Sequence, residues 1–121
     1  MSVKTHSLVK QVQSWRPNNG RWLATLSLKP GEVGERAGIE FRSDADDLGH
    51  YLAAFVQLSS GLEFMLRWDE HPYIPGTMLW GPADATVTKS QLRTLLTALH
   101  IRTDEVAELS PELKPTKPAE E

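Results

Sequence analysis

Carboxylates and an imidazole are adjacent in the run Asp69, Glu70 and His71, which makes this run a candidate for general acid–base catalysis. Such catalysis needs side chains that converge on one point and have perturbed pKa values. Side chains of consecutive residues at the end of a strand point in different directions. The run by itself therefore predicts no catalytic residue, and an enzyme is the less favoured class for this chain.

A second acidic cluster begins at Asp44 and has the composition of a metal site without its spacing. A calcium-binding loop that started there would need an oxygen ligand and a glutamate where this chain has Leu48 and Phe55. Asp46 and His50 alone are too few ligands for a transition metal, and the absence of cysteine excludes thiolate sites. Glycine-rich nucleotide-binding motifs are also absent from the sequence. We therefore expect no metal and no cofactor.

Two tryptophans bracket a basic turn in the N-terminal part of the sequence. Residues 1–30 contain five bases and no acid, and residues 17–20 have the composition of a tight turn. If the segments on either side of this turn form a hairpin, two indoles can stack on bases while two arginines bind phosphates. The residues predicted to bind single-stranded nucleic acid in this way are Lys10, Trp15, Arg16, Arg21 and Trp22.

The segment 69–82 is the best candidate for an interaction site with another protein. Connections in compact domains usually have about 4–6 residues, and structureless ones beyond about 12–15 tend to be functional or disordered. This segment is too apolar for a linker, so its side chains either fold back on the sheet or form a partly exposed patch. The predicted partner-binding residues are Asp69, Glu70, His71, Tyr73, Ile74, Met78 and Trp80.

These features predict a small non-enzymatic interaction module that binds another macromolecule, with a protein (as regulator, adaptor or inhibitor) as the favoured role. The alternative is a single-stranded nucleic-acid-binding protein that uses the N-terminal hairpin, and a small-ligand binder or enzyme is the third choice. The net charge of −3 disfavours a dedicated duplex-DNA binder. We find no apolar run long enough to span a membrane and no signal peptide, so we expect a cytoplasmic protein without a membrane partner. The oligomeric state stays open.

Alternation of apolar and polar residues predicts two strands. Residues 22–28 alternate and place Trp22 on the core-facing side, and residues 62–68 place Trp68 there in the same way. We expect the first of these strands to pair with residues 9–15 as a hairpin, with a helix as the open alternative because Leu8, Val12 and Trp15 also fit helical spacing.

A T-x-x-Q capping box at Thr88 and a stripe of leucines predict a helix over residues 88–99. The segment 44–58 is ambiguous. Apolar residues at helical spacing after Ser43 favour a helix, and a strand over residues 51–58, joined to the next strand by a turn, is the open alternative. The remaining predictions are a loop after the strand at 22–28, a strand at 39–42, a short strand at 77–80 and a brief helix at 104–109.

The whole pattern predicts one α+β domain at residues 1–109 and a flexible tail at 110–121 that is rich in proline and charge. A chain of 121 residues can bury roughly two thirds of its extended surface and needs no disulfide or metal to build a core. We expect an antiparallel or mixed sheet of four or five strands with two main helices on one face.

Overall fold

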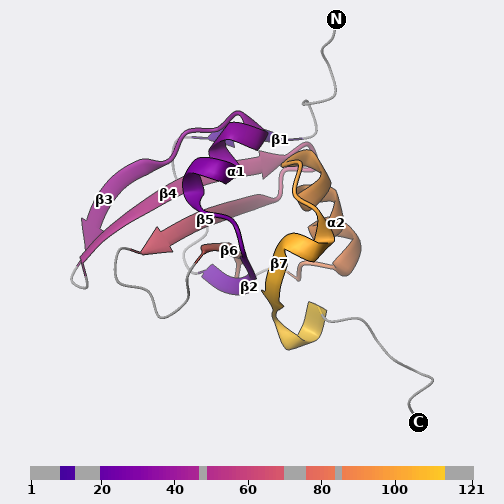
Figure 1. Cartoon of the computed structure of the whole chain (residues 1–121). Helices are drawn as coiled ribbons and strands as arrows, with labels where there is room; N and C mark the ends of the chain where they lie inside the picture. The colour runs from indigo at the N-terminus through magenta and orange to yellow at the C-terminus, as the bar shows by residue number, and fades with distance from the viewer. Residues whose placement is uncertain (1–8, 13–19, 47–48, 70–75, 84–85, 114–121) are drawn as a thin grey trace, which may run out of the picture.

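The computed structural model describes residues 9–12, 20–46, 49–69, 76–83 and 86–113. These residues form a seven-stranded antiparallel sheet and two α-helices (Figure 1). The predicted α+β class is therefore confirmed, and the predicted number of four or five strands is too low.

The strands do not follow one another in space as they do along the chain. Their spatial order is β1-β4-β5-β6-β2-β7, and β3 lies beside β4 on the same edge as β1. The elements, in chain order, are β1 (Val9–Val12), β2 (Gly20–Leu26), α1 (Pro30–Ala37), β3 (Arg42–Asp46), β4 (Gly49–Leu58), β5 (Glu63–Asp69), β6 (Thr77–Pro82), α2 (Lys89–Ala98) and β7 (Val106–Leu109).

The predicted N-terminal hairpin does not form between β1 and β2. β1 pairs with β4, whereas β2 lies between β6 and β7. Three strands separate β1 from β2, so the prediction that these two segments pair is wrong. Residues 17–19 of the turn sequence that suggested the hairpin lie outside the described residues, and Gly20 is the first residue of β2.

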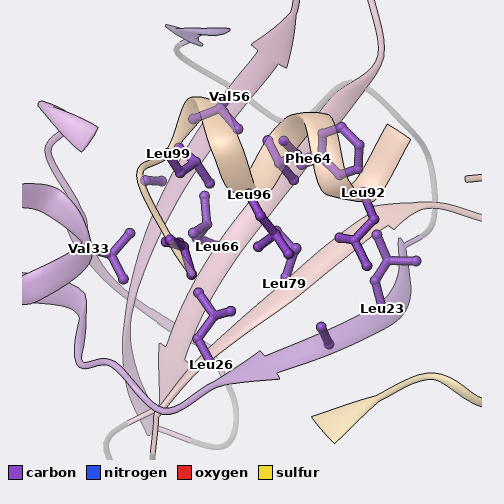
Figure 2. Packing of buried hydrophobic residues seen from close by; sticks show 14 of the residues in the cluster. Leu23, Leu26, Val33, Val56, Phe64, Leu66, Leu79, Leu92, Leu96 and Leu99 are labelled. Carbon is purple, nitrogen blue, oxygen red and sulfur yellow. The ribbon is translucent and has the colours of Figure 1, made fainter. Parts of the chain in front are cut away.

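The hydrophobic core lies on one face of the sheet, beneath α2 (Figure 2). Alternate residues of the central strands point into it, among them Phe64, Leu66 and Leu79, each fully buried. The predicted leucine stripe of α2 covers them, and Val33 of α1 joins the same cluster. Both helices thus supply residues to a single core.

Helix α2 begins as its sequence predicts. The Thr88 hydroxyl oxygen accepts a hydrogen bond from the Gln91 amide at 3.1 Å, and the Gln91 side chain accepts one from the Thr88 amide at 2.9 Å. This reciprocal pair satisfies two amides that the first turn leaves without helical partners.

The described residues of the segment 44–58 lie in strands β3 and β4, so the favoured helix prediction is wrong and the strand alternative for residues 51–58 is correct. β4 pairs with β5 in an unbroken register from Tyr51–Asp69 to Gln57–Glu63. On β4 the alternate residues Ala54, Val56 and Leu58 are buried, as expected of a strand with one face on the core. The pairing of β4 with β5 outweighs the helical spacing of the apolar residues, which is only a local signal.

The first helix lies instead in the predicted loop that follows β2. Pro30 occupies its first turn, where a missing amide hydrogen costs nothing, and the Lys29 amide donates to the Glu32 carboxylate at 2.9 Å. Gly38 ends α1 with a left-handed φ of +71°. The predicted strand at 39–42 is displaced accordingly, because β3 starts only at Arg42.

The C-terminal part of the chain is more ordered than its sequence predicts. The expected helix at 104–109 is a single 3-10 turn at Thr103–Glu105 followed by strand β7. A further 3-10 turn at Pro111–Leu113 brings Leu113 into the core at 5% exposure. The packed chain thus extends past residue 109, and the predicted tail lies outside the described residues only from 114 onward.

An ion pair joins α1 to the turn before β7. The Arg36 guanidinium lies 2.6 Å from the Glu105 carboxylate, which also accepts a hydrogen bond from the Arg102 amide at 2.9 Å. The hydrogen bond from Arg36, followed by that from Arg102, lowers the pKa of Glu105 from 4.5 to about 2. This carboxylate therefore stays charged in the folded protein at any pH well above 2.

We expect the stabilising effect of Glu105 to depend on pH. Because its pKa is lowered in the folded state, the effect is complete above pH 4.5 and is lost as the pH falls from 4.5 toward 2. Urea unfolding of the wild type and of Glu105→Gln measures it. The wild type should have the higher midpoint at neutral pH, and the difference should shrink in acid. A difference that is independent of pH would contradict the assignment.

Candidate functional site

The face of the sheet opposite the core carries a continuous line of apolar side chains, which we call the apolar row. It crosses five strands, because each member is the register partner of the next. All five side chains are half-buried, and both helices pack on the other face of the sheet. The members, from β1 to β2, are Val12, Phe55, Met65, Trp80 and Trp22.

The two tryptophans of the row lie directly opposite each other on neighbouring strands. A β-bulge between Trp22 and Ala24 puts Leu23 into the core at 1% exposure and turns Trp22 to the outer face. Plain alternation, counted along the sequence, placed Trp22 on the core side, and the bulge is the reason that this prediction is wrong. Cross-strand aromatic partners lie within contact distance of each other, so the two indoles form one surface with Trp80 nearer the middle of the sheet.

The two indoles differ in their hydrogen bonding. The Trp22 Nε1–H donates to the Thr25 hydroxyl at 3.0 Å, and Thr25 is itself buried. The Trp80 Nε1 is buried and has no hydrogen-bond partner in the part of the chain that the structure describes. A buried donor without a partner is unfavourable, so among the described residues it is packing that holds Trp80 in place.

This difference predicts unequal effects of two otherwise matched substitutions. Trp22→Phe removes a hydrogen bond and leaves the buried Thr25 hydroxyl without its donor, whereas Trp80→Phe removes a donor that has no partner. We expect Trp22→Phe to lower the free energy of unfolding by about 1 kcal/mol more than Trp80→Phe does. Chemical denaturation of both variants measures the difference. Equal losses, or a larger loss in Trp80→Phe, would contradict the assignment of these two donors.

A charged group adjoins the apolar row toward the β3–β4 end of the sheet. The Arg67 guanidinium lies over the ring of Tyr51, 3.9 Å from its centroid, and its Nη2 is 2.8 Å from the Asp69 carboxylate. Met78 is the register partner of Arg67 on β6. Asp69 is therefore held by an arginine on the same strand, on the same face as Met78 and Trp80.

The structure brings together the described part of the predicted protein-binding set. Asp69, Met78 and Trp80 share the outer face, as their register positions show. Glu70, His71, Tyr73 and Ile74 were predicted with them and lie outside the described residues.

The predicted nucleic-acid-binding set is dispersed. Lys10 lies on the outer face of β1, far across the sheet from Trp22 on β2. Arg21 is the register partner of Gly81 on the core side of β6, and its guanidinium lies 3.4 Å from the Glu112 carboxylate. Trp15 and Arg16 lie outside the described residues.

Sequence reasoning missed Phe55 and Met65, which link the tryptophans to β1. Phe55 lies in the segment for which a helix was favoured, and Met65 lies on the side of the 62–68 strand that the alternation predicts to face away from the core. The strand alternative for residues 51–58 points to Phe55, because it alternates with the buried residues of β4, and the alternation of residues 62–68 places Met65 on the outer side of β5. Their alignment with Trp80 depends on register, which single strands do not encode.

In the part of the chain that the structure describes, no group of three His, Cys, Asp or Glu residues could hold a metal ion. Neither described helix has the length and apolar character that crossing a bilayer requires. Comparison with protein-family models, curated proteins and solved structures finds no significant match to this chain.

Proposed function

We propose that this protein is an interaction module that binds another protein through the outer face of its sheet. The apolar row carries this proposal. A line of five half-buried apolar side chains, two of them tryptophans, continues across β1, β4, β5, β6 and β2 on the face opposite both helices. Tryptophan, tyrosine and arginine are the residues most enriched at the energetic centres of protein interfaces, and this face has Trp22, Trp80, Tyr51 and Arg67 together.

The charges around the row support a protein partner rather than a phosphate backbone. Three bases and four acids whose side chains the structure describes occupy outer-face positions of the strands, so this face has no strong positive field. An apolar centre with a rim of mixed charge is the usual composition of a protein–protein interface. The charged residues are Lys10, Arg42, Arg67, Asp44, Glu63, Asp69 and Glu108.

The proposal is tested by a substitution at the middle of the row. Met65→Glu places a charge between Phe55 and Trp80, where desolvation on binding would be costly. Tagged wild type and Met65→Glu are used to capture proteins from cells of the native host under nuclease treatment, with identification by mass spectrometry. We expect a protein that the wild type retains and that Met65→Glu binds at least tenfold more weakly, which is about 1.4 kcal/mol.

The control is Thr97→Glu, which adds the same charge at an exposed position of α2, on the other side of the molecule. It should capture the partner as the wild type does. Circular dichroism of all three proteins shows that the fold is kept. A partner that binds Met65→Glu and the wild type equally would remove the outer face from consideration.

Single-stranded nucleic acid is the second candidate, and the paired indoles favour it. Aromatic side chains on an open sheet face can stack bases whatever the sequence. Few cations near the indoles are available to bind phosphates. Arg21 faces away from Trp22 and pairs with Glu112, and Arg67 pairs with Asp69. A gel shift with a single-stranded oligonucleotide tests it: strong binding that weakens with salt and is lost in Trp22→Ala would favour this function over the first.

A further inference from the structure

A second apolar surface lies on the core side of the sheet, where the strands extend past the helices. The β3–β4 hairpin and the end of β5 project away from α2 (Figure 1). Two hollows there, of about 520 Å³ and 300 Å³, have Leu52 in common. We call them together the trough. It runs from α1 to His50, and its other principal lining residues are Gly34, Glu35, Phe41 and Trp68.

The bottom of the trough is a cross-strand pair, Leu52 on β4 and Trp68 on β5. Both side chains are half-buried, and neither belongs to the core cluster or to the apolar residues packed against it. The alternation of β5 predicted Trp68 as a core residue. It points to the predicted face but lies beyond the region that the helices fill, so a large apolar side chain is left at the surface.

One carboxylate lines the trough. Glu35 of α1 is the only acidic side chain among the described lining residues of the two hollows, and no lysine or arginine is among them. Arg36 is bound to Glu105, and Arg42 is the register partner of Ala53 on the outer face. A trough with an apolar bottom and a single carboxylate beside it complements a ligand that is apolar and positively charged.

We propose that the trough binds a basic peptide segment of a partner protein. The segment places a leucine or aromatic side chain against Leu52 and Trp68, with a lysine or arginine beside Glu35. Such a cation also gains from the face of the Trp68 ring when it lies over it. The volume of the larger hollow is in the range of pockets that hold a peptide side chain or a small ligand. This surface is separate from the apolar row, so the inference does not depend on the proposed function.

A random peptide-display library, selected on the full-length chain, tests the proposal. We expect an enriched family in which a leucine or aromatic residue is flanked by lysine or arginine. A fluorescent peptide of that family should bind Trp68→Ala and Glu35→Lys at least tenfold more weakly than the wild type, and should bind Met65→Glu unchanged. Raising the salt concentration should weaken binding, because the pairing with Glu35 is exposed.

The matched control for Glu35→Lys is Glu108→Lys, an equally exposed charge reversal on β7. It should leave peptide binding unchanged, which separates the trough from a general attraction of basic peptides to an acidic protein. If Trp68→Ala does not fold, peptide binding to Glu35→Lys compared with binding to Glu108→Lys decides the proposal. Enrichment of acidic peptides, or peptides that bind every variant equally, or no enrichment at all, would overturn the proposal.

Discussion

Gly76→Ala is expected to destabilise the protein by about 3 kcal/mol, the upper part of the range for single substitutions. Gly76 has a φ of +136°, a conformation that residues with a Cβ rarely adopt. A Cβ built at this position would overlap the carbonyl oxygen of Leu26. The backbone cannot move aside, because the amide and the hydroxyl of the buried Thr77 both donate to the Leu28 carbonyl, at 3.0 Å and 2.8 Å.

Gly31→Ala is the matched control for this prediction. Gly31 lies within α1, and a Cβ there would meet no other atom within 4 Å. Alanine is the better helix former, so we expect a gain of about 0.5–1 kcal/mol. Urea denaturation of both variants gives the comparison. A Gly76→Ala protein with wild-type stability would show that the turn into β6 is not held by these contacts.

Truncation after Ser110 is expected to cost about 2–4 kcal/mol, the range for removal of a buried leucine. Leu113 is 5% exposed within the core cluster, and its amide donates to the Ser110 carbonyl at 2.9 Å. Truncation also removes Glu112, whose carboxylate pairs with Arg21. The sequence alone predicted a flexible tail from residue 110, whereas Leu113 is packed in the core.

Truncation after Leu113 is the control. Residues 114–121 contain two prolines and no apolar run, so from their sequence we expect their removal to change the thermal midpoint by no more than a few degrees. Leu113→Ala in the full chain should reproduce most of the loss seen in the longer truncation. Identical stability of the two truncated chains would show that Leu113 contributes nothing.

Elements with local causes could be predicted from the sequence. The capping box at Thr88 and the leucine stripe behind it all lie within α2, and the alternation of β5 lies within one strand. Helix α1 was missed because its signals are weak on a propensity scale: it has eight residues, and Gly31 and Gly34 are among them. The helix begins at Pro30, and the Glu32 carboxylate accepts a hydrogen bond from the Lys29 amide at this end. The prediction of a loop for these residues took neither signal into account.

The candidate site could be predicted only in part, because it depends on how distant strands align. Met78 and Trp80 were found from the unusual apolar content of their segment. Their grouping with Phe55 and Met65 required the register of three strands, and the place of Trp22 required a bulge. A shift of one residue in any of these pairings would turn the side chain to the other face. For Trp68 the sequence predicted the correct face of the sheet, but it did not predict that this side chain lies beyond the region that the helices fill.

The position of β2 in the sheet has a consequence for the order in which the chain folds. β2 precedes both of its neighbours in the chain by more than 50 residues, since these are β6, which begins at Thr77, and β7, which ends at Leu109. The pairing of β2 with β6 and with β7 closes long loops. The chain loses conformational entropy on loop closure before the strand contacts form, and this slows folding. The nascent chain therefore carries β2 with both edges open until β6 is made, and with the edge toward β7 open until residue 109. Capture of β7 is then a late step, and it is this step that brings Glu105 to Arg36.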